Sequence, residues 1–401
     1  MRGELVTRTW EWNPILYAPP KYRRACRYEA LIPEKLGGTH FSLWTTVAGV
    51  VSEAEQAISN LNARATPALA PLARLLLRTE SIASSKVEGL QVGVAQLARA
   101  EARIAAGGRA APTILEVLRN IEAMQVAVDE AASADRVGVE HILGVHRKLM
   151  AGATAAEAAG MLRTSQNWIG GNDYNPCGAD YVPPPPEHLP PLLEDLCDAV
   201  EEESLPPLVQ AAMVHAQFES IHPFDDGNGR TGRALIHVVL RRRGIAASYV
   251  PPVSVALAMR RERYIEGLIG FRMGEVGSWI ERFAAAAALS SGLAIAYLEA
   301  VTDLMDEWRG KLAAAAAPRS DGAAWAIIDV LPAHPVITAP LVAAATGRAK
   351  SAVHNALEQL VDSGVLAPLS QSKRNRSWEA VGLLDLLEGL ETGRAPKRAP
   401  G

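Results

Sequence analysis

A short run at residues 221–233 constrains the fold of this 401-residue chain more than any other feature. It reads Ile-His-Pro-Phe-Asp-Asp-Gly-Asn-Gly-Arg-Thr-Gly-Arg. The preceding stretch, 208–221, is apolar on most faces, which predicts a buried helix. Because Pro223 disfavours the helical conformation for the residue before it, we expect His222 in a loop just past this helix. A second helix is predicted to start near Asn228, a good N-cap residue, and to run to Gly244.

The two arginines of this run point to an anion. Arg230 and Arg233 are predicted to lie three residues apart in the first turn of the second helix, on one face. A cation at a helix N-terminus is unfavourable by roughly 0.3–1 kcal/mol. Two of them beside free backbone N–H groups are explained if an anion such as a polyphosphate binds there. The residues alone therefore indicate a phosphate site next to a histidine that can act as a base.

The same run resembles the His-Pro-Phe-x-(Asp/Glu)-Gly-Asn-Gly-Arg-x-x-Arg motif of Fic-domain proteins, which transfer AMP from ATP to protein hydroxyls, and every fixed position matches. The resemblance implies that His222 is the general base and that Asp226 binds the Mg²⁺ that bridges the phosphates of ATP. Asp225 falls at the variable position, where a solvated turn residue is the simpler interpretation. The implied phosphate contacts are Gly227, Asn228, Gly229, Arg230 and Arg233. Phe224 is interpreted as a core anchor.

A loop upstream of the motif resembles the Fic flap, a hairpin that clamps the target segment by strand-like pairing. Its residues are Gly170, Gly171, Asn172, Asp173 and Tyr174, between a Trp168-Ile169 flank and a Tyr181-Val182-Pro183 flank. Gly, Asn, Asp and Pro dominate the segment 170–179, which predicts a loop. The alternative interpretation is an ordinary surface loop with no partner.

A further segment resembles the inhibitory motif of the family, (Ser/Thr)-x-x-x-Glu-(Gly/Asn). Here it consists of Ser84, Glu88 and Gly89, with Ser84 and Glu88 on one helix face and Gly89 as a residue that ends the helix. A glutamate at a helix C-terminus is unfavourable with respect to the dipole, so we expect a positive partner. The resemblance makes that partner Arg233. The alternative is a solvated surface glutamate.

The fold class predicted from these features is mostly α: a Fic helical core with a short β-hairpin flap, plus a C-terminal winged helix of α+β character. The predicted domains are an N-terminal Fic-associated segment at 1–105 with the inhibitory helix at about 72–88, and a catalytic core at 106–313. The core holds the flap at about 166–182 and the motif at 222–233. A winged helix at 320–391 and a disordered tail at 392–401 complete the chain. Within the winged helix, helices are predicted at 325–331, 339–346 and 349–363 with a turn at Gly347, and strands at 364–366 and 377–381 are predicted to form the wing.

The predicted winged helix could bind DNA or a protein, and the sequence favours neither. Its basic residues lie on the recognition-helix side and in the wing. They are Arg348, Lys350, His354, Lys373, Arg374 and Arg376. A net charge of −4 argues against sequence-independent binding to nucleic acid.

The remaining composition predicts a cytoplasmic protein. Three cysteines occur, Cys26, Cys177 and Cys197, without a CxxC pair, which indicates neither a disulfide framework nor a zinc site. The N-terminus has no apolar signal region. A long uncharged run, 283–298, is interpreted as a buried helix rather than a membrane span.

The function implied by the resemblance is a protein adenylyltransferase that is autoinhibited by Glu88. It transfers AMP from ATP to a Ser, Thr or Tyr hydroxyl of a target protein or of itself. One alternative is removal of AMP, or a bifunctional enzyme, in which Glu88 positions water. A second is a DNA-binding regulator that senses nucleotide. No Walker A or His-Arg-Asp kinase loop is present. Members of the family are often dimers, so a homodimer is expected.

Overall fold

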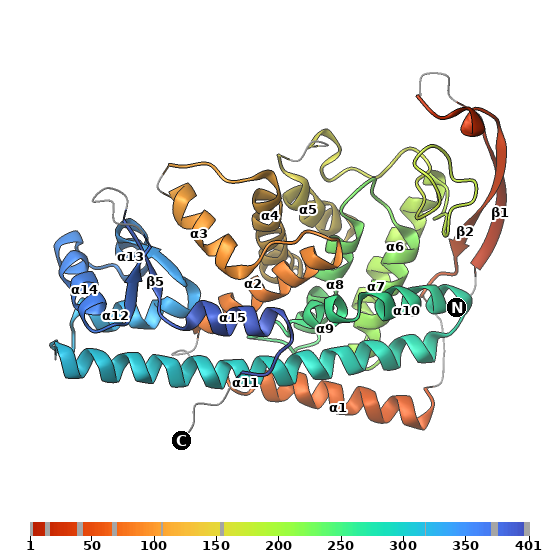
Figure 1. Cartoon of the computed structure of the whole chain (residues 1–401). Coiled ribbons are helices and arrows are strands. Elements are labelled where there is room, and N and C mark those ends of the chain that lie inside the picture. Colours follow the sequence, from red (N-terminus) through yellow and green to blue (C-terminus); the bar gives the residue numbers. More distant parts are fainter. Residues whose placement is uncertain are drawn as a thin grey trace. The chain divides into compact units, whose positions relative to one another are not determined.

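The chain folds into two compact units, and each unit is assembled from separate segments. Figure 1 labels the helices and strands along the chain. The computed structural model describes residues 3–12, 17–37, 43–65, 70–105, 107–152, 156–316, 318–369 and 376–396. The first unit comprises Met1–Glu55, Glu122–Ile245 and Arg261–Ala285, and the second comprises Gln56–Ile121, Ala246–Arg260 and Ala286–Gly401. The described residues are mostly helical, as predicted. Each unit draws on several stretches of sequence, and the predicted domain ranges remain predictions.

The first unit contains the motif and the predicted flap. Its elements are β1 (Gly3–Trp10), η1 (Pro20–Tyr22), β2 (Cys26–Pro33), the start of α1 (Thr45–Asn62), the end of α4 (Pro112–Val126), the π-helix η3 (Ala127–Ala131), α5 (Val139–Met150), η4 (Ala156–Ala158), η5 (Pro186–His188), α6 (Leu189–Glu201), α7 (Pro207–Ile221), α8 (Asn228–Arg242), α10 (Arg261–Met273) and the start of α11 (Val276–Ala315).

Helix α7 is the buried centre of this unit. Every residue from Leu208 to Ile221 is buried, which confirms the predicted helix and its environment. Its neighbour α8 approaches closely at Gly232. A Cβ atom at this position would lie 2.4 Å from the Glu219 Oε1 atom and 2.8 Å from the Phe218 Cδ1 atom. Only glycine therefore allows the two helices to pack at this distance.

The N-terminal hairpin was not predicted. Strands β1 and β2 pair antiparallel, from Gly3 opposite Pro33 to Trp10 opposite Cys26. Strand β1 has no fully buried residue. It therefore lacks the buried face that gives a strand its alternating pattern of apolar and polar residues. The hairpin is stabilised by pairing and by contacts with the flap loop, which a local pattern does not reveal.

The cysteines also correct an expectation. Cys26, at the start of β2, forms a disulfide with Cys177 in the predicted flap, 151 residues later. Cys197 is free and buried. Cysteine spacing could not indicate this pairing, because the bond joins two segments that meet only in the folded unit.

The second unit contains the predicted inhibitory helix and the C-terminal region. Its elements are the end of α1, α2 (Ala70–Val87), α3 (Val94–Ala105), the start of α4, α9 (Val253–Met259), the rest of α11, α12 (Ala323–Val330), η6 (Leu331–Ala333), β3 (Val336–Thr338), α13 (Ala339–Thr346), α14 (Lys350–Asp362), β4 (Leu366–Pro368), β5 (Ser377–Ala380) and α15 (Leu383–Glu391). The three short strands form one antiparallel sheet in the order β3-β5-β4.

The C-terminal elements follow the predicted order closely. Helix α13 has its predicted bounds, and Gly347 after it takes a left-handed conformation with φ 66°. Helix α14 and the two strands β4 and β5 were also expected, and β3 adds a third strand. Lys373 and Arg374 lie outside the described residues. In the predicted tail, Thr392–Arg394 donate backbone hydrogen bonds to α15, and residues 397–401 lie outside the described residues.

A single hydrophobic core joins α2 to the C-terminal helices within this unit. It includes Leu76 of α2, Leu97 of α3, Ile327 of α12, Leu357 of α14 and Leu387 of α15. Burial of such side chains stabilises the unit by roughly 1.5–3 kcal/mol each. Helix α2 is therefore a structural member of the unit that also carries the C-terminal region.

Polar contacts fix α2 in place as well. The buried Glu80 carboxylate accepts hydrogen bonds from the Ser254 N–H at 2.8 Å and from its hydroxyl at 2.5 Å. Near the C-terminal end of the helix, the Lys86 ammonium pairs with the Glu391 carboxylate of α15 at 3.3 Å. Glu391 is buried, so the pair is shielded from solvent screening.

Helix α11 is, within the described residues, the one helix that is long and apolar enough to cross a membrane by length and composition alone. Of its most apolar window, 44% is buried inside the protein. Buried core helices meet the same criterion, and the segment 283–298 expected to be helical lies within it.

Candidate active site

His222 lies at the C-terminal end of α7 in a left-handed conformation, with φ 48° and ψ 60°. Among the described residues it is the only non-glycine residue with positive φ. Its N–H donates to the Phe218 carbonyl at 2.9 Å and closes the helix. Backbone strain of this kind costs roughly 1–3 kcal/mol and persists where the surroundings impose it. The position predicted for His222, just past the helix, is confirmed.

Asn228 holds the motif loop in shape. Its side-chain Oδ1 atom accepts from the Phe224 N–H at 2.9 Å, and its Nδ2 atom donates to the Phe224 carbonyl at 2.8 Å. The predicted N-cap role is wrong, because α8 begins at Asn228 and its N-cap is Gly227, with φ 77°. A Cβ atom on Gly227 would also lie 3.1 Å from Leu149 and Met150, so conformation and space both require glycine there.

The two motif arginines are buried at the start of α8, whereas the two aspartates of the loop are exposed. The Arg233 side chain is 1% exposed and that of Arg230 is 4% exposed. The Asp226 carboxylate accepts from the Gly227 N–H at 2.6 Å and lies 3.8 Å from the Arg230 guanidinium. Buried guanidinium groups at a helix N-terminus form a strong anion site. The exposed carboxylate of Asp226 lies at its edge.

The positive charge of Arg233 affects His215 of helix α7. Burial first, and the nearby Arg233 second, lower the pKa of His215 to about 3. His215 is fully buried, and its Nε2 atom lies 2.9 Å from the Tyr264 hydroxyl. His215 is therefore neutral at neutral pH and has a structural role. It adds no further positive charge to that of the two motif arginines.

His146 of α5 positions the motif loop, a role that the sequence did not reveal. Its Nδ1 atom accepts from the Gly160 N–H at 2.9 Å, so its Nε2–H donates to the Asp226 carbonyl at 3.0 Å. Its ring stacks on Phe224 with centroids 3.6 Å apart. Phe224 is fully buried, which confirms its interpretation as a core anchor. Burial lowers the pKa of His146 to about 4, despite the opposing hydrogen bond to the Asp226 carbonyl.

Arg163 links the motif loop to both ends of the flap segment. Its buried guanidinium donates to the carbonyls of His222 at 2.9 Å, Ser165 at 3.1 Å and Pro184 at 2.5 Å. Its own N–H donates to the Pro223 carbonyl at 3.0 Å. Burial lowers the pKa of Arg163 to about 10, so it stays charged at neutral pH. It is a positioning residue that fixes the backbone at His222.

The predicted flap is a closed loop. Ile169 and Tyr181 pair as an antiparallel bridge, with the Ile169 N–H donating to the Tyr181 carbonyl at 2.8 Å. Gly170 and Gly171 both have φ 75°, and a Cβ atom on Gly170 would lie 1.9 Å from the Asp180 carboxylate. The predicted flap residues 170–174 therefore lie in one loop that the Ile169–Tyr181 bridge closes.

The base of the flap is attached next to His222. The buried Tyr181 hydroxyl donates to the Ser220 carbonyl at 2.6 Å, two residues before His222. The Arg272 guanidinium lies 3.8 Å from the centre of the Tyr181 ring, and burial raises the pKa of this phenol to about 12. The flap and the histidine are thus held in one fixed local frame within the first unit.

The predicted inhibitory residues lie in the second unit. Helix α2 ends at Val87, so Glu88 falls in the following turn and is exposed, whereas Ser84 is fully buried. Gly89 has φ 89°, which confirms that it ends the helix. Glu88 and Arg233 belong to different units, so their pairing stays a prediction.

Within the described part of the chain, no group of three or more His, Cys, Asp or Glu side chains is arranged to hold a metal ion. Mg²⁺ is usually held by one or two carboxylates together with substrate phosphates. The single exposed carboxylate of Asp226 beside an anion site fits that pattern.

Family models match both parts of the chain that carry these residues. Residues 136–240 match the Fic/DOC family, and residues 49–129 match the N-terminal region of the Fic/DOC family. The chain therefore contains a Fic/DOC domain with its N-terminal region. The first match covers the motif, the flap, His146 and Arg163, and the second covers α2 and Glu88.

Curated relatives agree with this assignment. The chain is 33% identical over 133 residues to protein adenylyltransferase fic-1 of Caenorhabditis elegans, a match that covers 32% of this chain and 23% of the relative. It is 31% identical over 168 residues to protein adenylyltransferase Fic of Nematostella vectensis, covering 41% of this chain and 36% of the relative. The matched region thus spans about a quarter to a third of the length of these relatives.

Solved structures show the same fold. A Fic family protein from Desulfovibrio desulfuricans G20 is similar with a TM-score of 0.53 and 23% identity, covering 85% of this chain and 98% of that one. A Fic-domain signalling protein from Bacteroides thetaiotaomicron has a TM-score of 0.51 and 18% identity, covering 63% of this chain and 98% of that one.

The lowered pKa of His146 predicts a specific dependence of stability on pH. Between about pH 4 and 6.5 the unfolded state binds a proton at His146 that the folded state does not, so stability falls as pH is lowered through this window. We expect a loss of about 3 kcal/mol from this residue on going down to pH 4. Urea denaturation between pH 4 and 7 measures it. The variant His146→Gln keeps a donor and an acceptor but does not titrate, so its free energy of unfolding should change less with pH. The same pH dependence in both proteins would contradict a lowered pKa for His146.

Proposed function

We propose that this protein is a protein adenylyltransferase, which transfers AMP from ATP to a Ser, Thr or Tyr hydroxyl of a target protein or of itself. The observation that carries the proposal is the arrangement of the motif. His222 is held in a strained conformation at the end of α7, and two buried arginines stand at the start of α8. The names of the curated relatives support the same activity.

The reaction requires one proton transfer and one phosphoryl-type displacement. His222 takes the proton of the target hydroxyl, whose oxygen forms a bond to the α-phosphorus of ATP. The bond from the α-phosphorus to the bridging oxygen breaks, and pyrophosphate leaves. Arg163 and Asn167 hold the carbonyl groups of the loop, with the Asn167 Nδ2 atom 2.9 Å from the Phe224 carbonyl, so that the imidazole keeps its position.

The phosphates of ATP fit the start of α8. The backbone of Gly227, Asn228 and Gly229 and the guanidinium groups of Arg230 and Arg233 supply hydrogen-bond donors and positive charge. Mg²⁺ would be held by Asp226 together with the phosphates, and it would neutralise part of their charge. Asp225 is also exposed, and because it falls at the variable position of the motif it is taken as a solvated residue.

The target segment is proposed to lie along the flap. Residues 170–174 belong to a loop whose base is fixed next to His222 through Tyr181 and Arg163. An extended segment can pair with such an edge through its backbone, which would hold its hydroxyl side chain in reach of the histidine.

Glu88 is proposed to inhibit this activity by pairing with Arg233. An arginine occupied by Glu88 cannot bind the outermost phosphate, and ATP would then bind with its α-phosphate out of line. The support is the inhibitory motif at the end of α2 and the match of this region to the N-terminal family model. Helix α2 is anchored by its core and by Glu80, so Glu88 is presented from a rigid element.

Two alternatives use the same chain. In the first, Glu88 positions a water molecule and AMP is removed from the modified protein. In the second, the C-terminal elements α12–α14 with β3–β5 form a winged helix that binds DNA or a protein, and the Fic domain senses nucleotide. The order of helices and strands supports a winged helix, with Arg348, Lys350 and His354 near α14.

Replacement of His222 tests the base. His222→Asn suits a left-handed position and cannot take the proton at neutral pH, so AMP transfer should fall at least on the order of 10²-fold while ATP binding is kept. Incorporation of label from ATP carrying a labelled α-phosphate measures transfer, and calorimetry measures ATP binding. His222→Ala should behave alike with somewhat lower stability. Near-normal labelling by both variants would remove His222 from the mechanism.

Replacement of the two aspartates tests the metal site. Asp226→Ala should lose Mg²⁺-dependent labelling, because the carboxylate beside the arginine pair is gone. Asp225→Ala is the matched control, because Asp225 is also exposed and is one residue away, and it should lose little. A titration of labelling rate against Mg²⁺ concentration compares them. Equal losses would show that the carboxylate was assigned wrongly or that both residues bind.

Replacement of Glu88 tests autoinhibition. Glu88→Gly should free Arg233 and raise the initial rate of labelling strongly, since a misplacement of about 1 Å can cost about 10²-fold in rate. The double variant Glu88→Gly, Arg233→Ala should be as inactive as Arg233→Ala. If Glu88 instead serves AMP removal, labelled protein accumulates but the initial rate stays flat. An unchanged initial rate therefore rejects autoinhibition.

A further inference from the structure

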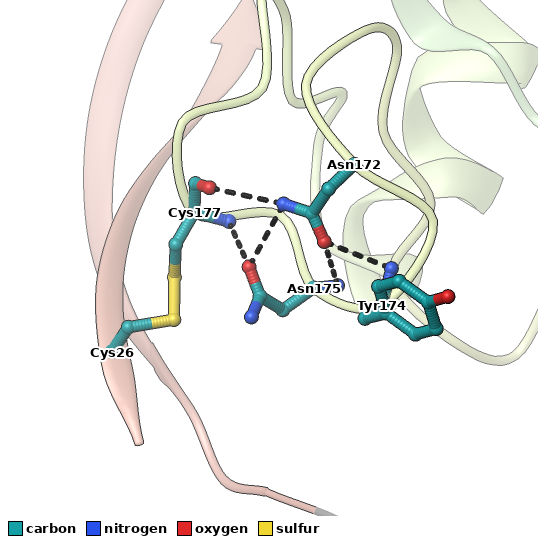
Figure 2. The surroundings of a disulfide bond; sticks show 5 residues. All are labelled: Cys26, Asn172, Tyr174, Asn175 and Cys177. Atoms are coloured by element: carbon teal, nitrogen blue, oxygen red, sulfur yellow. Dashed lines mark hydrogen bonds between the residues drawn. A yellow bond between two sulfur atoms is a disulfide. The ribbon is translucent and has the colours of Figure 1, made fainter. Parts of the chain in front are cut away.

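The disulfide between Cys26 and Cys177 joins the N-terminal hairpin directly to the flap (Figure 2). Cys26 is the first residue of β2, and Cys177 lies in the loop between Ile169 and Tyr181. Both cysteines are half-buried, so a small thiol can reach the bond. The cross-link therefore lies at the edge of the site where the target segment is proposed to bind.

Aromatic contacts run along the same boundary. The rings of Tyr22 and Tyr174 stack with centroids 5.2 Å apart, and those of Trp10 and Trp168 meet edge to face at 5.4 Å. Near the base of the flap, the Leu31 N–H donates to the Val182 carbonyl at 3.0 Å. The hairpin thus touches the flap at its turn and at its base.

The turn of the flap is otherwise held by its own residues. The Asn172 Oδ1 atom accepts from the Tyr174 and Asn175 N–H groups at 2.9 and 3.0 Å, and the Asn175 Oδ1 atom accepts from the Cys177 N–H at 3.1 Å. Figure 2 shows these bonds gathered beside the disulfide. Such local bonds preserve the shape of the turn but do not fix its direction. The disulfide and the Tyr22 ring supply that restraint.

We propose that the N-terminal hairpin is a redox-dependent brace that holds the flap in the orientation needed to bind the target. A dithiol reductant reduces the bond: two electrons and two protons pass to Cys26 and Cys177, which become thiols, and the dithiol becomes a disulfide. The flap is then free to turn about its base. His222 and the arginine pair keep their places, because Arg163 and Tyr181 hold the base by contacts that do not involve the cysteines. The expected effect on the target rests on the proposed function, whereas the effect on the flap does not.

Hydrogen exchange of the intact chain tests the brace without any enzyme assay. Peptides that cover residues 169–181 are compared in the air-oxidised protein, after treatment with dithiothreitol, and in the variants Cys26→Ser and Cys177→Ser. We expect exchange in this segment to be at least about tenfold faster in the reduced protein and in both variants, with peptides of α7 and α8 unchanged. Cys197→Ser is the matched control: its buried thiol has no disulfide partner, so it should exchange and respond to dithiothreitol like the unmodified protein.

Two outcomes of that comparison would overturn the brace. One is an exchange rate of the segment that is the same in all forms. The other is peptide mapping without reductant that finds Cys26 and Cys177 as free thiols in the air-oxidised protein. Faster exchange that extends over α7 and α8 would also reject it, because the bond would then stabilise the whole unit rather than the flap.

Labelling of target proteins tests the functional part in the Glu88→Gly background. Incorporation of α-labelled AMP into lysate proteins should be at least about fivefold lower with the Cys26→Ser, Cys177→Ser pair than with Cys197→Ser, because the target is held less well. Calorimetric binding of ATP with Mg²⁺ should be alike in both. Equal labelling, or a parallel loss of ATP binding, overturns regulation through the flap. If no form transfers AMP, the proposed function itself has failed, and hydrogen exchange still decides the brace.

Discussion

One buried guanidinium, that of Arg163, holds the candidate site together. It donates to the carbonyls of His222, Ser165 and Pro184 and so ties the end of α7 to both ends of the flap segment. Removing such a charged donor would leave buried carbonyl groups without partners, at roughly 1–3 kcal/mol each. The strained conformation of His222 depends on this support, because a left-handed histidine is stable only where its neighbours impose it.

The first unit has two kinds of element around this contact. One is the packed pair of helices α7 and α8 with the loop between them, and the other is the flap. Helices α7 and α8 pack closely at Gly232, and Phe224, His146 and Asn228 fix the loop between them. These contacts fix the backbone around the proposed phosphate site, as preorganised charge stabilisation requires. The flap has a fixed base and a turn that is restrained from outside, by the N-terminal hairpin.

The second unit gives the predicted inhibitory helix a different kind of support. Helix α2 shares its hydrophobic core with α12–α15, and Lys86, two residues before Glu88, pairs with Glu391 of α15. The C-terminal helices thus help to hold α2, the helix that Glu88 directly follows, because they share its hydrophobic core. The hydrophobic core of this unit includes residues on both sides of position 320.

The sequence by itself determined the local chemistry: the helices on either side of the motif, the loop position of His222, the glycines of the loop and the order of the C-terminal elements. These follow from short-range rules such as apolar periodicity, proline sterics and glycine turns. Only the tertiary structure decided the roles of Arg163 and His146, whose partners lie 59 and 80 residues away, and the pairing of Cys26 with Cys177. It also showed that Asn228 stabilises the loop instead of capping α8. Each of these depends on which surfaces meet after folding, and no local pattern in a single chain carries that information.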